Sequence, residues 1–329
     1  MNKLLPWWAI DLHVHGRGEN QSYKATIASV IELALSQGVG MIIDMPNVAR
    51  PVINRERVYD RLALVPKNHR DCYCLFVGLT GEKEQIYEAV LCHNNIPEVV
   101  GFKMFAGKSV GDLSVVNEED QRMIYRHLSE RKFSGVLAVH CEKEDYLKPD
   151  LWNSDNPISH TWARPEEAEV ESVRDQILLA TEENFTGRLH ICHVSCPDSV
   201  YLIDEAKTAG LQISCGVTPH HIMWDSSIMN RPDGLIYKMN PPLRRLESML
   251  KLRDQLVAGM IDVIETDHAP HTVAEKQAPL CFSGYPSLEL YGKFVTEFLP
   301  SLELSQDKIK ALTRDNILRI FGDKLKFAA

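Results

Sequence analysis

Short apolar runs alternate along this chain with longer stretches in which apolar residues recur every three or four positions. The runs are rich in Val, Ile and other apolar residues without alternation, which is typical of strands covered on both faces. Such an alternation predicts repeated βα units and a parallel sheet. Eight runs fit: 8–15, 40–45, 72–79, 99–105, 136–141, 189–194, 211–217 and 261–266. Eight units predict an α/β protein with the (β/α)8 TIM-barrel architecture.

Helical periodicity fills several of the connections between these runs. Residues 25–36 place Ile27 and Ile31 on one stripe, and Gly38 supplies a stop. Pro165 and the two glutamates after it open another helix in the way a first turn favours. Further helices are expected at 117–128, 198–209 and 246–257.

The chain is predicted to form one domain. No linker, internal repeat or low-complexity tract divides residues 1–329, a length that suits a barrel of about 250 residues with insertions. Residues 143–161, which include Pro149 and Pro157, are expected to form a loop insertion over the barrel mouth. Residues 305–321 are expected to form a closing helix at the other end.

Composition narrows the function without naming it. Hydrophobic residues make up 44% and charged residues 25% of the chain, the net charge is -9, and no Lys/Arg-rich run is present. This balance argues against binding to nucleic acid or to an anionic membrane. The apolar run after Lys3 contains Pro6 and ends at Asp11, too short for a signal or membrane segment. We therefore expect a cytoplasmic protein that acts on a small molecule. Cys72, Cys74, Cys141 and Cys215 lie in apolar runs typical of buried strands and are expected to be reduced core thiols.

Histidines and one aspartate fall where predicted strands end. His13 and His15 close the first run, and residues two apart in a strand face the same side. His140 closes the fifth run, His193 lies in the sixth, and Asp267 follows the eighth. Barrel enzymes place their chemistry at this rim. Five such groups would each need a buried partner, and a metal supplies one for all of them.

Lys103 lies at the end of the fourth run, in Gly101-Phe102-Lys103-Met104-Phe105. An unpaired ammonium inside a barrel is costly, so this lysine is expected to be paired, neutral or chemically modified. A lysine that reaches the surface is the alternative, which the strand pattern leaves open.

These motifs together resemble the amidohydrolase superfamily and, within it, the dihydroorotases. The matching stretches run in the family's order along nearly the whole chain: 11–15 (DLHVH), 45–47 (MPN), 101–105 (GFKMF), 139–142 (VHCE), 191–195 (ICHVS), 217–221 (VTPHH), 240–244 (NPPLR) and 266–271 (TDHAPH).

The resemblance implies two zinc ions per subunit. One would be held by His13, His15 and Asp267, and the other by His140 and His193. Lys103 matches the family lysine that CO₂ carboxylates, so that it bridges both metals together with a hydroxide. The hydroxide would attack the ring amide of (S)-dihydroorotate to give N-carbamoyl-L-aspartate, a reversible step of pyrimidine biosynthesis. Asp267 would carry the proton to the leaving nitrogen.

The resemblance also implies a carboxylate subsite. Residues that match Arg17, Asn47 and His271 bind the substrate carboxylate in the family, and Asn240 lies along the ring. An arginine suits this role because its guanidinium grips a carboxylate through two hydrogen bonds. A solvated loop arginine is the alternative.

The chain departs from the family in three places. Residues 16–20 read GRGEN, where many relatives have Leu-Arg-Glu-Pro-Gly. Some animal relatives bind a third metal through a cysteine like Cys192 and a glutamate where this chain has Gly216, so a third site is not expected here. The first run begins close to the N-terminus, and we expect no substantial β-sandwich domain.

Other functions stay open. An allantoinase or dihydropyrimidinase would share the metal centre but not the substrate. A catalytically inactive partner of aspartate transcarbamoylase is disfavoured, because all six predicted ligand positions are intact. A metal-free barrel with a structural histidine cluster is the remaining alternative. We expect a homodimer, with association with aspartate transcarbamoylase as an option.

Overall fold

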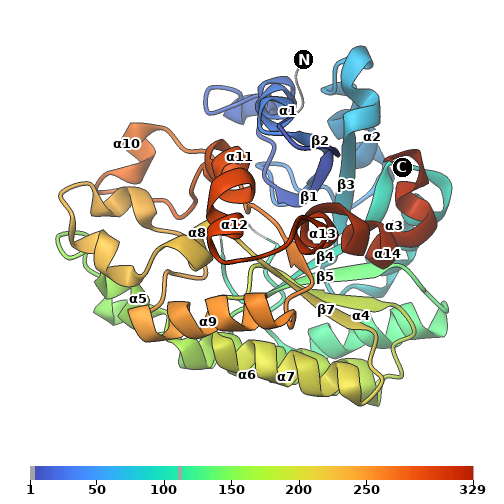
Figure 1. Cartoon of the computed structure of the whole chain (residues 1–329). Helices are drawn as coiled ribbons and strands as arrows, with labels where there is room; N and C mark the ends of the chain where they lie inside the picture. Colours follow the sequence, from blue (N-terminus) through green and yellow to red (C-terminus); the bar gives the residue numbers. More distant parts are fainter. Residues whose placement is uncertain (1–3, 110–112, 329) are drawn as a thin grey trace.

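Eight parallel strands form one barrel in sequence order, β1 to β8. The computed structural model describes residues 4–109 and 113–328. Helices surround the strands (Figure 1), which confirms the predicted (β/α)8 fold. The strands are β1 (Ala9–Val14), β2 (Val39–Asp44), β3 (Tyr73–Gly78), β4 (Val99–Ala106), β5 (Val136–Cys141), β6 (Arg188–Ile191), β7 (Ile213–Val217) and β8 (Val263–Ile264). Each lies within or beside one of the eight predicted runs.

The barrel closes between β1 and the segment that follows β8. Val14 and His268 form a parallel bridge, and the His15 amide donates to the His268 carbonyl at 2.8 Å. The buried Asp11 carboxylate takes the place of further backbone pairing. It accepts from the Thr266 amide at 3.0 Å and from the Thr266 hydroxyl at 2.6 Å.

The last strand is shorter than predicted, because other groups use the backbone of the 261–266 run. The Asp262 carbonyl accepts from the Asn316 side chain at 2.8 Å, and side-chain bonds from Asp11 replace ladder bonds at Thr266. The local hydrophobic pattern holds no sign of these distant partners.

All five predicted helices are confirmed. Thr26 caps the first of them through a capping box with Ser29, and Asn117 caps α4. Figure 1 shows α6, α7 and α9 along one side of the barrel. The helices that cover the strands are α1 (Ile27–Ser36), α2 (Arg55–Ala63), α3 (Lys83–Asn95), α4 (Glu118–Glu130), α6 (Glu166–Glu182), α7 (Pro197–Thr208) and α9 (Leu246–Ala258).

Short helices and turns fill the remaining connections. The 143–161 segment holds 3-10 turns at Glu144–Tyr146 and Pro149–Leu151 and leads into α5. The short helices are α5 (Ser159–Ala163), α8 (Pro219–Met223), α10 (Val273–Lys276), α11 (Tyr291–Lys293), α12 (Leu299–Ser301), α13 (Gln306–Lys310) and α14 (Asn316–Phe321). A π-helical turn, Ala311–Asp315, joins α13 to α14.

The barrel interior has an apolar core that the C-terminal segment covers. Ile317, Ile320 and Phe321 of α14 pack with interior residues from the strands, among them Ile10 and Phe76. The Phe76 and Phe321 rings lie 6.0 Å apart. The polar residues of the pocket described below lie at the carboxyl ends of the strands, so the interior core supports them from beneath.

All eight cysteines are free. Cys74, Cys141 and Cys215 are buried as expected, whereas Cys72 is only half-buried, so the expectation of a core thiol is wrong at that position. Within 4–109 and 113–328, no helix is long and apolar enough to cross a membrane.

Candidate active site

A pocket opens at the carboxyl ends of the strands, where the sequence predicted the chemistry. Eight of the ten predicted site residues line it, together with five residues that the sequence did not single out. The lining residues are His13, His15, Arg17, Asn47, Phe105, Ser109, His140, His193, Asn240, Asp267, Ala269, Ser283 and Gly284. Lys103 and His271 are not among them.

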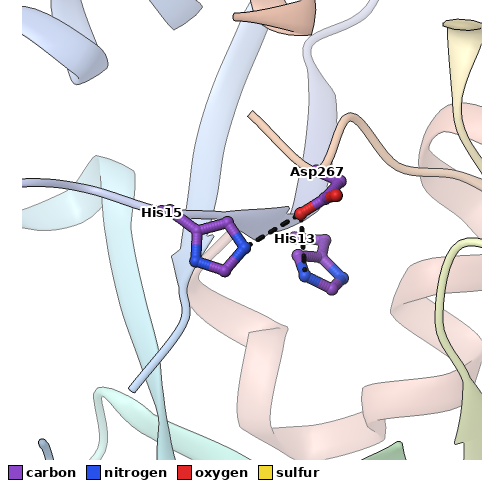
Figure 2. A group of neighbouring side chains, drawn as sticks. All are labelled: His13, His15 and Asp267. Carbon is purple, nitrogen blue, oxygen red and sulfur yellow. Dashed lines mark hydrogen bonds and ion pairs between the residues drawn. The ribbon is translucent and has the colours of Figure 1, made fainter. Parts of the chain in front are cut away.

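The first cluster combines two histidines at the end of β1 with an aspartate that follows β8. The Asp267 carboxylate oxygen Oδ1 lies 2.9 Å from His15 Nε2 and 3.3 Å from His13 Nε2. Figure 2 shows both imidazoles directed at this carboxylate. All three residues are buried, and their ligand atoms lie within 4.8 Å of one another. Two imidazoles and one carboxylate in this arrangement are a ligand set that zinc and similar divalent metals accept.

The second cluster lies beside the first. His140 Nδ1 and His193 Nε2 face each other across 3.2 Å, and the His13 and His193 rings lie 4.9 Å apart. Burial holds the pKa of His13 and of His193 well below the usual range, and neighbouring positive charge lowers both further. Neutral imidazoles keep the lone pairs that bind metal.

Backbone strain marks a residue in each cluster. His193 has a φ of 37° and Asp267 a φ of 49°, in the left-handed region that favours glycine. Such conformations cost about 1–3 kcal/mol each and gather at functional sites, where surrounding structure enforces them. The turn after β6 and the turn after β8 thus aim both side chains at the pocket.

Lys103 lies beside the two clusters, fully buried on β4. Its Nζ contacts the Cys192 thiol at 2.9 Å and lies 5.1 Å from the centre of the Phe105 ring. Within the part of the chain that the structure describes, no carboxylate lies within ion-pair distance of it. Because Lys103 is fully buried, the alternative of a lysine that reaches the surface is wrong.

The residues present fit a divalent metal. His193 Nδ1 is buried without a hydrogen-bond partner. His13 Nε2 and His15 Nε2 converge on Asp267, and His140 Nδ1 faces His193 Nε2. Buried polar groups in folded proteins are almost always satisfied. A cation would satisfy the converging lone pairs, so the buried group of His13, His15 and Asp267 indicates a metal site.

A glutamate that the sequence did not single out orients His140. Glu142 Oε2 lies 3.1 Å from His140 Nε2, which leaves Nδ1 facing His193. Arg164 holds Glu142 through two bonds, of 2.6 and 2.9 Å. Burial raises the pKa of Glu142, but Arg164 and His140 outweigh burial and the net pKa lies below its usual range. A carboxylate behind a histidine fixes its ring and tautomer.

Arg17 and His271 lie together at the edge of the pocket. Arg17 Nη2 is 3.4 Å from His271 Nε2, and Arg17 Nε donates to the Pro270 carbonyl at 3.2 Å. Burial lowers the pKa of Arg17 to about 10 and that of His271 to about 3, so at neutral pH the guanidinium is charged and the imidazole is neutral. Arg17 is 3% exposed, so the alternative of a solvated loop residue is wrong.

The two predicted asparagines reach the same pocket from other loops. Asn47 follows β2, and Asn240 lies between α8 and α9. The Asn240 Oδ1 lies 3.0 Å from His160 Nε2 of α5, so the 143–161 segment supports this wall.

The loop that carries Arg17 is held from beneath by a buried ion pair. Arg61 of α2 bonds Asp44 of β2 at 2.7 Å and donates to the carbonyls of Gly16 and Arg17. Asp44 also accepts from the Gly16 amide at 2.7 Å and from the Tyr73 hydroxyl at 2.6 Å. This network fixes the loop at the point where the sequence departs from the family pattern.

Replacing Arg61 with methionine is expected to lower the free energy of unfolding by about 3–5 kcal/mol, because Asp44 would stay buried without its partner. Urea unfolding measures the change. Arg55→Met, on the exposed side of the same helix, is the matched control and should change stability little. A loss below about 1 kcal/mol in Arg61→Met would match a surface pair and contradict this prediction.

Sequence reasoning missed Glu142 and Glu265, which both contact the histidine clusters. A signal was present, since Glu142 follows His140 by two positions and Glu265 precedes Asp267 by two. Residues two apart at a strand end share a face. No local pattern marks the five other lining residues.

No protein-family model matches this chain. The dihydroorotase of Lactobacillus gasseri is 30% identical over 323 residues, which cover 95% of this chain and 72% of that protein. The dihydroorotase of Halobacterium salinarum is 30% identical over 321 residues, 95% of this chain and 71% of that protein.

Solved structures agree on the fold. The L-hydantoinase (dihydropyrimidinase) of Arthrobacter aurescens matches 95% of this chain and 70% of its own, with a TM-score of 0.83 at 23% identity. The dihydropyrimidinase of Brevibacillus agri matches with a TM-score of 0.80 at 21% identity. The relatives' sequences, together with a barrel that gathers His13, His15 and Asp267 at its rim, show that this chain belongs to the dihydroorotase-like family of cyclic amidohydrolases.

Proposed function

We propose that this chain is a dihydroorotase, which interconverts (S)-dihydroorotate and N-carbamoyl-L-aspartate. The observation that carries the proposal is that the Arg17 guanidinium is buried and lines the pocket beside the histidine clusters. Within 4–109 and 113–328, no carboxylate lies within ion-pair distance of it. Burying a cation without an anionic partner costs free energy, and the carboxylate of a bound substrate would supply that partner. Hydantoin and dihydrouracil lack this carboxylate.

Two zinc ions would be held at the base of the pocket. One would take His13, His15 and Asp267, and the other would take His140 and His193. Lys103, once carboxylated, would add an anionic ligand to this centre. When bound, such metals supply Lewis acidity toward the ring carbonyl and lower the pKa of water.

The protein side chains move the proton and orient the ring. Asp267 lines the pocket and is 7% exposed, so its carboxylate would face a bound ring. It would take the proton from the water and pass it to the leaving amide nitrogen. The same positions serve the reverse reaction, in which the carbamoyl nitrogen closes the ring.

Carboxylate recognition would fall to Arg17 and Asn47, with His271 acting through Arg17 and Asn240 along the ring. Arg17 offers its guanidinium, and His271 lies beside it at 3.4 Å. His271 does not line the pocket itself. It also contacts the Ser283 carbonyl at 3.1 Å, so we assign it to the wall that holds Arg17 in place.

Arg17→Met is expected to raise KM for dihydroorotate about 10- to 100-fold, because charge-assisted hydrogen bonds contribute about 1.5–3 kcal/mol. Steady-state kinetics measure the change. Arg50→Met removes an exposed arginine from a nearby loop and should leave KM as it is. An unchanged KM in Arg17→Met would remove Arg17 from the carboxylate subsite.

A substrate panel tests the function itself. The purified chain is incubated with dihydroorotate, dihydrouracil, hydantoin and allantoin, and ring opening is followed for each. We expect dihydroorotate to be turned over with the highest kcat/KM. Faster opening of an uncharged ring would overturn the proposal in favour of a dihydropyrimidinase or hydantoinase activity. The expected homodimer and an association with aspartate transcarbamoylase stay predictions.

A further inference from the structure

Glu265 lies directly behind the two histidine clusters, out of the pocket. It follows β8, is fully buried, and does not line the pocket. Its Oε2 lies 3.4 Å from His13 Nδ1, and its Oε1 accepts a hydrogen bond from the backbone amide of His193. One carboxylate therefore contacts a candidate ligand from each of the two clusters.

The contact with His13 determines which ring nitrogen can face a metal. When Nδ1 carries its proton toward Glu265, the lone pair lies on Nε2, the atom 3.3 Å from Asp267. Carboxylates behind metal-binding histidines fix the tautomer and ring orientation in this way. The contact with His193 acts on the backbone instead, at a residue whose φ of 37° needs support.

A third group keeps the carboxylate in place. His190 Nε2 lies 3.6 Å from Glu265 Oε2, and His190 Nδ1 contacts the Ser214 hydroxyl at 2.9 Å. Both residues are buried on β6 and β7. A buried carboxylate needs such partners, since desolvation without them is costly.

Gly216 of β7 supplies the space that Glu265 occupies. A Cβ atom built on Gly216 would lie 2.4 Å from Glu265 Oε1 and 2.7 Å from its carboxyl carbon. Both distances are well below ordinary van der Waals contact. A glycine on β7 and a glutamate after β8 are thus complementary in shape, and any side chain at 216 would displace the carboxylate.

We propose that Glu265 is a positioning residue that links the two halves of the metal centre, and that Gly216 is required to admit it. The inference rests on the metal centre of the proposed function but not on the identity of the substrate. Its readout is metal affinity, so a different ring substrate would leave it standing.

A competing role for Glu265 is direct ligation. Its carboxylate, His13 and the Cys192 thiol have ligand atoms within 4.8 Å of one another, which is close enough to surround an additional ion. The Cys192 thiol, however, already contacts Lys103 Nζ at 2.9 Å. We therefore assign Glu265 to positioning, and the number of metals bound decides between the two roles.

The test measures zinc affinity and stoichiometry by competition with a chromophoric chelator. Glu265→Gln keeps the size of the side chain but removes its charge, and we expect about 10- to 100-fold weaker zinc binding. Gly216→Ala keeps every ligand and should weaken binding by a similar factor. The relocation variant Gly216→Glu/Glu265→Ala returns a carboxylate to the same space from β7 and should recover most of the affinity. Wild type should bind two zinc ions per chain.

Three results would overturn the proposal. Unchanged affinity in Glu265→Gln would show that the carboxylate does not position the ligands. A third zinc ion that is lost in both Glu265→Gln and Cys192→Ser would make Glu265 a ligand. Failure of the relocation variant to exceed Gly216→Ala, with both folded by circular dichroism, would show that Gly216 serves packing alone.

Discussion

Replacing Lys103 with methionine should remove bound metal and lower kcat/KM for dihydroorotate about a thousandfold or more. The expected size follows from metal catalysis, which supplies several kcal/mol of transition-state stabilisation, and about 4 kcal/mol corresponds to a thousandfold. Lys103 is fully buried beside both clusters, and its Nζ contacts the Cys192 thiol. As an ammonium it would repel cations there, whereas a carboxylated lysine would attract them.

Three measurements separate the possible outcomes. Metal content of the purified variant reports ligation, kinetics report turnover, and intact mass of the wild type under native conditions reports the addition of CO₂. Lys108→Met, which removes an exposed lysine near the pocket, is the control. A Lys103→Met variant with full metal loading and full activity would exclude Lys103 from the metal centre.

The barrel could be predicted from sequence because its signal is local. Each strand is buried on both faces, so eight short apolar runs stand out between helical stretches. Burial of β5 over Val136–Cys141 matches the predicted run residue for residue. The 261–266 run kept only Val263–Ile264 as strand, because Asp11 and Asn316, far away in sequence, bond to its backbone.

Site residues were predictable where a metal-binding residue type, histidine or aspartate, falls at the end of a predicted strand. His13, His15 and Asp267 satisfy both conditions, and the structure brings them together. Glu142 and Glu265 also lie at strand ends, but a glutamate there is usually solvated. Their burial depends on Arg164, on His190 and on the space above Gly216, which only the folded chain reveals.

The geometry of the loop around Arg17 could not be predicted from the sequence either. Its sequence departs from the family pattern, so the family gave no guide to its geometry. Two groups fix it: Asp44 at the end of β2 and Arg61, which lies 44 positions beyond Arg17. A contact between residues so far apart leaves no trace in local periodicity.

Asp267→Asn should lower kcat by about 10²- to 10⁴-fold, the range expected when a proton-transfer group is removed. Asparagine keeps a side-chain oxygen for His13 and His15 but cannot accept a proton. It also tolerates the left-handed backbone at this position, where φ is 49°, so the turn should survive. KM should change little, because the carboxylate subsite is untouched.

Metal content distinguishes the two roles that Asp267 would combine. If the variant keeps its zinc and loses kcat, proton transfer is the larger contribution. If zinc and kcat are lost together, ligation is the larger contribution. Asp254→Asn, on the exposed face of α9, is the matched control. Wild-type kcat in Asp267→Asn with zinc retained would require a different base, and no other described carboxylate lines the pocket.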